Sequence, residues 1–500
     1  MLDVEIATAY GILRGFEDDD LVHWRGVPYA APPVGPRRFR APQPPAPWQG
    51  VRDASRYGAV APQQRTTAAF GVGRRTRVSE DCLTLNITAP RMPADAPRPV
   101  MVFVHGGANT LGTGSVPLYD GVELVRRGDI IYVSINYRLG VLGFMDFSAY
   151  STPEHTFESN LGLRDQVAAL RWVHDNIHAF GGDPDRITVF GESAGAMAVT
   201  ALMATPAARG LFARAIAQSS APALVNGREQ SEHLAADFLE MAGIGASDAP
   251  RRLIAADAMD FVRTLNKLTK KYAADKPGLN PVALTVDGDY LPKHPIDAFT
   301  DGSAAQVPLI IGTNRHEAAL FAKFGNALPT TPELIDRLFR NTDPDAQARI
   351  TAAYSGYPSK RAAIALGGDY IFWWPSVQVA DGHSPHASAY AYRYDFGTRF
   401  LRVIGLGATH GVELFAVFGK TRRGFARVLT SFGGGRGFED VGTRMRDQWL
   451  LFARTGHPGT DWPRYVTDDR RTMLFKRHDE VVSDPHAARR QAWTGYNNYR

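Results

Sequence analysis

The chain has 500 residues, 44% of them hydrophobic, which is enough to build a large core. Its net charge of +5 comes from basic residues that are mostly scattered along the sequence, which argues against a nucleic-acid-binding protein. No apolar run approaches the roughly 20 residues that cross a bilayer, and the acidic N-terminus does not read as a secretory signal. We therefore expect a cytoplasmic protein without nucleic-acid or membrane partners, as a monomer or homodimer.

The N-terminal half alternates strand-like runs with a helical segment. Residues 29–47 are rich in proline and predict an extended wrap rather than regular structure. Between residues 160 and 177, apolar positions recur with helical spacing. This alternation predicts a mostly parallel sheet with helices on both faces. The continuous apolar runs that predict buried strands are residues 83–88, 100–105, 130–136 and 187–190.

The C-terminal half interrupts this pattern with two helical, less apolar stretches, residues 222–299 and 331–381. Strand-like apolar runs return after each of them, at residues 307–314 and 387–394. We interpret the helical stretches as insertions over the sheet, within a single domain that spans residues 1–500.

A Gly-x-Ser-x-Gly sequence follows the run at residues 187–190 and opens a helix of small residues. It places Ser193 between Gly191 and Gly195, where a sharp turn from strand to helix lifts a hydroxyl clear of the sheet edge. The pentapeptide alone is weakly specific, but the strand before it and the helix after it supply the specificity. We therefore predict that Ser193 is a nucleophile.

A serine nucleophile needs a base that is itself oriented by a carboxylate. In sheets of this kind the expected chain order is Ser, then Asp or Glu, then His, each after a strand. His410 fits this order and follows a loop with two glycines, and Glu317 follows the run at residues 307–314. On spacing alone, an exposed loop carboxylate is an equally good interpretation of Glu317.

The run at residues 100–105 is followed by two adjacent glycines, Gly106 and Gly107. A bend there lets backbone N–H groups converge on the negative charge that develops on an attacked carbonyl oxygen. A simple turn is the alternative interpretation.

No pattern in the sequence indicates a metal or another cofactor. The chain has no His-Glu-x-x-His sequence and a single cysteine, Cys82, while His383 and His386 lack helical spacing and further ligands. The glycine-rich residues 431–437 lack the Gly-Lys-[Ser/Thr] ending of a phosphate loop and predict a surface loop. We expect a reaction that needs no cofactor.

Together these sites resemble the type B carboxylesterase/lipase family, most closely its bacterial esterases of the para-nitrobenzyl esterase kind. The resemblance implies an α/β-hydrolase fold, with the helical insertions over an active-site gorge, and a catalytic triad of Ser193, Glu317 and His410. It also implies that the amides of Gly107, Ala108 and Ala194 form the oxyanion hole. The matching segments are residues 24–33, 80–87, 136–140, 160–166, 190–195 and 410–419.

The resemblance also assigns supporting residues. Ser219 is similar to a serine that lies near the acid of the triad, and Glu413 to a supporting carboxylate. Arg38 with Glu80, and Arg138 with Asp165, are similar to ion pairs that stabilise loops. The chain departs from the family pattern at Cys82, which has no partner cysteine, at Asn109, where an aromatic residue is usual, and at Ala318, where glycine is usual.

The function that the resemblance implies is a serine carboxylesterase, which hydrolyses small-molecule carboxylic esters through an acyl-enzyme intermediate. The Gly-Gly-Ala sequence of the oxyanion loop leads to the hypothesis that esters of bulky or tertiary alcohols are substrates. The alternatives are a catalytically inactive cholinesterase-like interaction protein, or a specialised hydrolase of amides, carbamates or natural-product esters. The residues expected to line the pocket, with core packing as the alternative, are Leu320, Phe321, Phe372 and Trp373.

Overall fold

The computed structural model describes residues 3–65, 72–73, 75–325, 328–421 and 425–497. Among them, 13 strands form one central sheet and two strands form a small separate sheet. The central strands are β1 (Asp3–Thr8), β2 (Gly11–Asp18), β3 (Leu21–Pro28), β4 (Val51–Asp53), β5 (Thr84–Pro90), β6 (Arg98–Val104), β7 (Ile131–Ile135), β8 (Gly182–Glu192), β9 (Arg214–Gln218), β12 (Leu309–Asn314), β13 (Ala389–Tyr394), β14 (Arg471–Phe475) and β15 (Glu480–Ser483). The small sheet pairs β10 (Val225–Gly227) with β11 (Leu284–Val286).

The middle of the central sheet is parallel, in the order β7, β6, β8, β9, β12, β13 and β14. Antiparallel strands flank it, with β5, β3, β2 and β1 beyond β7 and with β15 beyond β14. Parallel neighbours need crossover connections, which the helices supply. The prediction of a mostly parallel sheet is confirmed.

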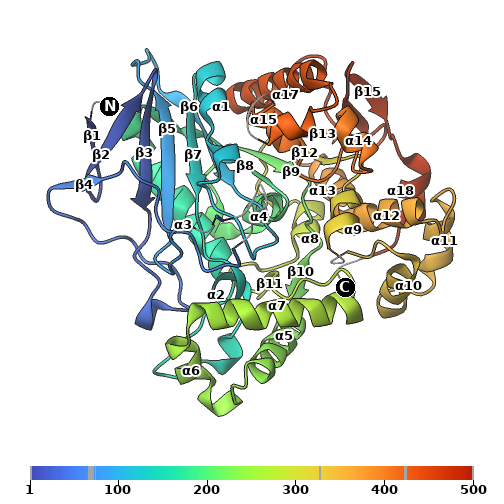
Figure 1. Ribbon diagram of the computed structural model, residues 1–500, viewed down its shortest axis with the longest axis horizontal. Helices are drawn as coiled ribbons and strands as arrows, with labels where there is room; N and C mark the ends of the chain where they lie inside the picture. The colour runs from blue at the N-terminus through green and yellow to red at the C-terminus, as the bar shows by residue number, and fades with distance from the viewer. Residues whose placement is uncertain (1–2, 66–71, 74, 326–327, 422–424, 498–500) are drawn as a thin grey trace.

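Side chains along β6 alternate between two hydrophobic cores on opposite faces of the sheet. Val100, Val102 and Val104 pack into the core that contains α3 and α4. Met101 and Phe103 pack into the other core, with α1, α15 and α17, which lie together at the top of Figure 1. Helices therefore cover both faces, as predicted. These helices are α1 (Val122–Gly128), α3 (Leu161–Asn176), α4 (Ala194–Ala204), α15 (Glu413–Val417) and α17 (Gly435–Thr455).

The other helices cluster in two parts of the chain. Those from α5 to α8 lie between residues 228 and 300, and those from α10 to α13 lie between residues 332 and 383, the latter around a third hydrophobic core. In Figure 1 the long α7 runs across the lower part of the molecule, above α5 and α6, and α10 to α12 lie at the right side. The remaining helix bounds are α2 (Gly140–Phe144), α5 (Arg228–Met241), α6 (Ala249–Ala255), α7 (Ala258–Asp275), α8 (Pro295–Thr300), α9 (Ala319–Phe324), α10 (Pro332–Asn341), α11 (Ala346–Ala352), α12 (Lys360–Gly368), α13 (Trp374–His383), α14 (Arg399–Val403), α16 (Ala426–Leu429) and α18 (Ala487–Trp493).

Two features of the fold differ from the sequence-based expectations. The first 28 residues contain three antiparallel strands, β1 to β3, that the apolar-run pattern did not indicate. The edge strand β1 has no continuous apolar run, since it alternates exposed and half-buried residues. The glycine-rich residues 431–437 are only partly a loop, since α17 begins at Gly435. The packing of Phe438 and Val441 in the core holds this helix despite the poor helix propensity of glycine.

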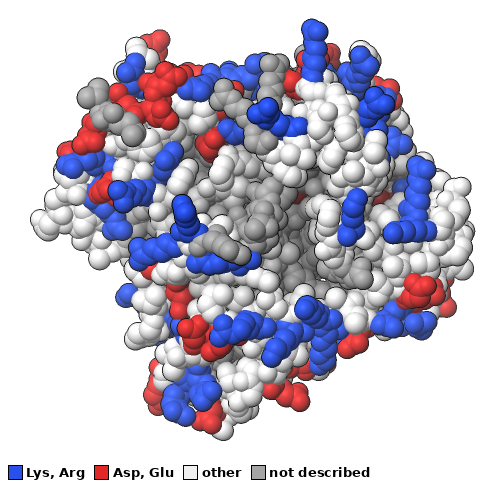
Figure 2. All heavy atoms as spheres, in the orientation of Figure 1, with Lys and Arg blue, Asp and Glu red and all other residues white. Residues whose placement is uncertain are grey.

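The surface has no concentrated basic patch on the face shown in Figure 2, where lysine and arginine side chains are interspersed with acidic ones. Within the described ranges, no helix combines the length and the apolar character that crossing a membrane requires. The same residues contain no group of three or more His, Cys, Asp or Glu side chains arranged to hold a metal ion.

Candidate active site

Ser193 lies at the sharp turn between β8 and α4, in a backbone conformation with φ of 57° and ψ of −125°. The neighbouring glycines make this turn possible because they approach backbone closely. A Cβ added to Gly191 would lie 2.6 Å from the carbonyl oxygen of Gly195, and one added to Gly195 would lie 2.0 Å from that of Val104. The turn predicted from the sequence is therefore present, with strain at Ser193 itself.

His410 and Glu317 meet because they follow adjacent parallel strands. β12 pairs with β13, so the loops after both strands leave the same edge of the sheet, where His316 N–H donates to Ala408 O at 2.9 Å. The Nδ1 atom of His410 lies 2.6 Å from Oε2 of Glu317, in a buried hydrogen bond. This contact joins the two residues that were predicted to be base and acid.

Glu317 is 4% exposed, so the alternative of an exposed loop carboxylate does not hold. Its Oε1 atom accepts hydrogen bonds from Ser219 Oγ and from the backbone N–H of Asn314, both at 2.6 Å. Ser219 thus contacts the carboxylate, as the resemblance implied. Because both carboxylate oxygens are bound, the orientation of Glu317 toward His410 is fixed.

A carboxylate that the sequence interpretation missed, Glu192, lies on the other side of the imidazole. Its Oε1 atom is 3.2 Å from Nε2 of His410, although the two atoms are not aligned for a hydrogen bond. Burial raises the pKa of Glu192 to about 7. The only sequence signal was its place directly before Ser193, at the end of β8.

Glu413 is a third buried carboxylate in this cluster, and it accepts a hydrogen bond from the side-chain amide of Asn314. Burial and the nearby charges of Glu192 and Glu317 together raise its pKa to about 8. Burial alone would lower the pKa of His410, but the charges of Glu192 and Glu317 outweigh it and raise that pKa to about 9. Several shifted pKa values among neighbouring groups are typical of active sites.

The loop after β6 brings backbone N–H groups to the same place. Gly107 has a φ of 119° and Ala108 one of 53°, and a Cβ on Gly107 would lie 2.0 Å from the carbonyl oxygen of Leu111. Among the described residues, no hydrogen bond uses the backbone N–H of Gly107, Ala108 or Ala194. These N–H groups are free to bind an oxygen atom that enters the cavity.

Ser193, His410 and the oxyanion loop line one cavity of about 410 Å³. Phe321 and Phe372 pack against His410 with tilted rings, whose centroids lie 5.1 Å and 4.6 Å from the imidazole, and Leu320 also belongs to the lining. Apolar lining residues that the sequence interpretation did not name are Leu111, Met197, Leu224, Leu279, Leu328 and Ile371.

Trp373 does not line this cavity, in contrast to the expectation for the pocket. It lies next to Phe372 in a π-helical turn, so successive side chains point in different directions. Its ring contacts His486 instead, with the centroids 5.6 Å apart.

The two expected ion pairs are present. Arg138 binds both oxygens of Asp165, at 2.8 Å and 2.6 Å, and both side chains are buried. Arg38 binds Glu80 and also donates to three backbone carbonyls that precede α7. Cys82 is buried as a small apolar side chain. These contacts lie outside the cavity lining and stabilise loops.

Comparison with known proteins agrees with this geometry. The sequence profile of the carboxylesterase family matches residues 3–493. The chain belongs to the carboxylesterase family. It is 36% identical over 498 residues to the para-nitrobenzyl esterase of Bacillus subtilis, covering 97% of each chain. It is 35% identical to the fumonisin B1 esterase of Sphingopyxis macrogoltabida, over 95% of this chain and 86% of that one.

Solved structures of carboxylesterases have the same fold. A PNB esterase superposes with a TM-score of 0.86 at 36% identity, covering 98% of this chain and 99% of the other. A carboxylesterase of Geobacillus stearothermophilus superposes with a TM-score of 0.85 at 35% identity, covering 98% and 100%. The chain is therefore an α/β-hydrolase that hydrolyses carboxylic esters, and an inactive interaction protein is not favoured.

Proposed function

We propose that Ser193, His410 and Glu317 form the catalytic triad of this carboxylesterase. The hydrogen bond between His410 Nδ1 and Glu317 Oε2, beside a cavity that contains Ser193, carries this proposal. Ser193 Oγ attacks the ester carbonyl carbon while His410 Nε2 accepts its proton and then gives that proton to the departing alcohol. Water then attacks the acyl-enzyme, again with His410 as base, and releases the acid and Ser193.

The amides of Gly107, Ala108 and Ala194 are the proposed donors to the oxyanion of each tetrahedral intermediate. Each such donor contributes about 3–4 kcal/mol to the stability of the transition state in comparable sites. Ser219 keeps Glu317 oriented by donating a hydrogen bond to it. Glu413 holds Asn314, whose N–H also binds Glu317. No step in this scheme needs a metal or another cofactor.

A panel of p-nitrophenyl esters with graded acyl chains, assayed with the parent chain and with Ser193→Ala, tests the nucleophile. We expect rapid hydrolysis by the parent and a loss of at least about a thousandfold in the variant. Retained hydrolysis by Ser193→Ala at the parent rate would mean that another residue is the nucleophile.

The apolar lining next to His410 favours esters with medium or aromatic acyl groups, because Leu320, Phe321 and Phe372 offer no hydrogen-bond partners. The hypothesis that the Gly-Gly-Ala loop admits bulky alcohols extends this to esters of tertiary alcohols. Incubation with tert-butyl acetate, with a primary acetate as reference, tests it. Turnover of the primary acetate with no release of tert-butanol would reject the hypothesis.

The same proposal describes the protein as one domain, because strands of the central sheet come from both ends of the chain, α13 contacts β12 and β13, and α8 contacts α4. A monomer or homodimer that acts on small-molecule esters in the cytoplasm is the proposed form of the enzyme. Size-exclusion chromatography with light scattering checks its oligomeric state.

A further inference from the structure

The oxyanion loop is held in a conformation that needs an anchor. Three consecutive residues, Gly107, Ala108 and Asn109, have positive φ angles of 119°, 53° and 61°. For alanine the left-handed conformation costs about 1–2 kcal/mol, whereas asparagine tolerates it better. Contacts from the surrounding structure must therefore stabilise Ala108, whose N–H is one of the proposed oxyanion donors.

Asn109 supplies such contacts on both its backbone and its side chain. It is 1% exposed, and its carbonyl oxygen accepts a hydrogen bond from Gly140 N–H at 2.6 Å. Its side-chain amide donates to the carbonyl oxygen of Val282 at 2.9 Å. The residues just before Val282, from Gly278 to Pro281, line the same cavity as the oxyanion loop. Asn109 thus joins the donor loop to a second segment of the cavity wall.

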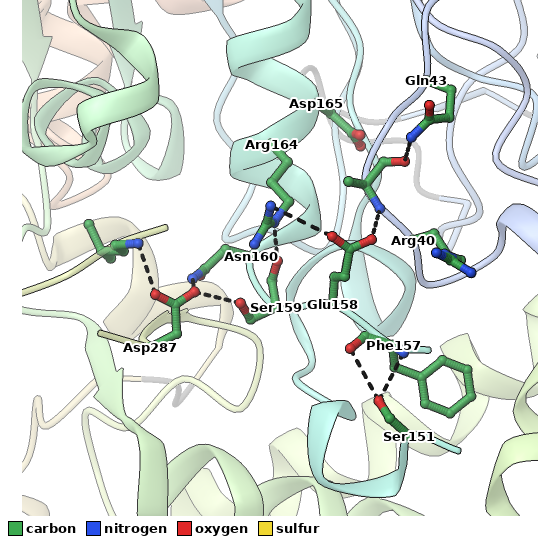
Figure 3. A network of polar contacts seen from close by, with 12 residues as sticks. Arg40, Gln43, Ser151, Phe157, Glu158, Ser159, Asn160, Arg164, Asp165 and Asp287 are labelled. Atoms are coloured by element: carbon green, nitrogen blue, oxygen red, sulfur yellow. Dashed lines mark hydrogen bonds and ion pairs between the residues drawn. The ribbon is translucent and has the colours of Figure 1, made fainter. Parts of the chain in front are cut away.

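A second buried asparagine, Asn160, binds residues that closely follow Val282 and lie farther from the active site. Asn160, with a φ of 54°, is 4% exposed. Its amide donates to Thr285 O and to Asp287 Oδ2, both at 2.8 Å, and its Oδ1 accepts from Thr285 N–H at 2.8 Å. Figure 3 shows Asn160 and Ser159 directed at Asp287. Asn160 is not part of the cavity lining, so it shares the conformation and burial of Asn109 without its position.

We propose that Asn109 is a positioning residue for ester hydrolysis, which fixes the N–H of Ala108 at the oxyanion site by binding Val282. This inference rests on the proposed function, because it assumes that Ala108 is an oxyanion donor. A donor stabilises the transition state only within a narrow geometry, and a displacement of about 1 Å costs about 10²-fold in rate. Loss of the contact should therefore lower kcat more than it changes KM.

The variant Asn109→Gly keeps the left-handed backbone accessible and removes the contact with Val282. We expect kcat to fall by about tenfold to a hundredfold, with KM nearly unchanged. Asn160→Gly is the matched control, because it removes a similar bond to the same segment. It should lower the unfolding temperature and leave kcat at the parent value.

A third variant covers the case in which Asn109→Gly does not fold. Asn109→His tolerates a positive φ and retains a side-chain N–H donor, so it should keep more activity than Asn109→Gly or Asn109→Asp, whose carboxylate faces a carbonyl oxygen. A trifluoromethyl ketone, which forms an adduct with its oxyanion among the loop amides, should lose affinity in parallel with kcat/KM.

Parent-like kcat in Asn109→Gly, or equal losses in Asn109→Gly and Asn160→Gly, would overturn the positioning role. Equal activity of all three Asn109 variants would do so as well. These outcomes are separate from failure of the proposed function, which Ser193→Ala reports: an inactive Ser193→Ala beside a fully active Asn109→Gly refutes the inference alone.

Discussion

Two buried clusters of charge differ in how completely their charges are satisfied. Arg138 and Asp165 neutralise each other through two hydrogen bonds, and Arg138 also donates to Arg40 O. Around His410, two carboxylates, those of Glu317 and Glu192, contact the imidazole, and a third, that of Glu413, lies nearby. The pKa of Arg138 stays raised by Asp165 despite burial, whereas the pKa values of Glu192 and Glu413 move toward neutral pH. A fully paired cluster stabilises the fold, and an incompletely paired one exchanges protons near neutral pH.

Among changes within these two clusters, the largest effect should come from breaking the bond between the acid and the base, although it should be milder than the loss of Ser193. Glu317→Gln keeps the shape of the side chain but cannot stabilise a charged imidazole, so we expect kcat to fall by about 10³- to 10⁴-fold. Stopped-flow or steady-state kinetics of p-nitrophenyl ester hydrolysis measures kcat, and thermal unfolding verifies that the variant is folded. A kcat near the parent value would mean that another carboxylate is the acid of the triad, and Glu413 would be the first to test.

The paired cluster should respond in stability rather than in rate. Arg138→Met leaves the buried carboxylate of Asp165 without a counter-charge, so the free energy of unfolding should drop by about 3–5 kcal/mol. Urea unfolding measures it, and the double variant Arg138→Met with Asp165→Leu should recover part of the loss. If Arg138→Met instead lowered kcat and left the free energy of unfolding unchanged, the proposed difference between the two clusters would be wrong.

Removing the hydroxyl of Ser219 should lower kcat by a smaller factor than Glu317→Gln does. Ser219→Ala deletes one hydrogen bond to Glu317, and a bond to a charged group contributes about 1.5–3 kcal/mol, so kcat should fall by about tenfold or somewhat more. Ser220→Ala, next to it and not bonded to Glu317, is the control. Equal kcat values in the two variants would show that Ser219 does not support the acid.

The smallest effect is a shift in pH dependence. The negative charge of Glu192 raises the pKa of His410, so Glu192→Gln should lower that pKa. Because the neutral imidazole is the base, activity rises with pH as His410 loses its proton, and the acidic limb of kcat/KM should move to lower pH in the variant. Profiles of kcat/KM against pH for parent and Glu192→Gln measure the shift. A limb that moves to higher pH would contradict the assigned interaction.

Much of the fold and of the proposed active site could be predicted from local patterns. The turn at Ser193 and the buried strands β5 to β8 each depend on a few consecutive residues, so short apolar runs and glycine positions were sufficient. Glu192 was missed because no local pattern distinguishes a carboxylate that faces the imidazole from one that faces solvent. Trp373 was misplaced for a related reason, since adjacent residues of a helical turn point in different directions and, of Phe372 and Trp373, only Phe372 faces the cavity.

The sequence by itself therefore determined the mostly parallel sheet with helices on both faces and the family, and it supplied the prediction that Ser193 is the nucleophile, because these depend on local periodicity and on motifs along the chain. Only the tertiary structure decided that Glu317 is buried against His410, that Glu192 and Glu413 share its surroundings, and that Asn109 reaches Val282 across 173 residues. Such contacts join segments far apart in the chain. Burial, hydrogen-bond partners and pKa shifts depend on the assembled surroundings of a residue, which adjacent positions in the sequence do not specify.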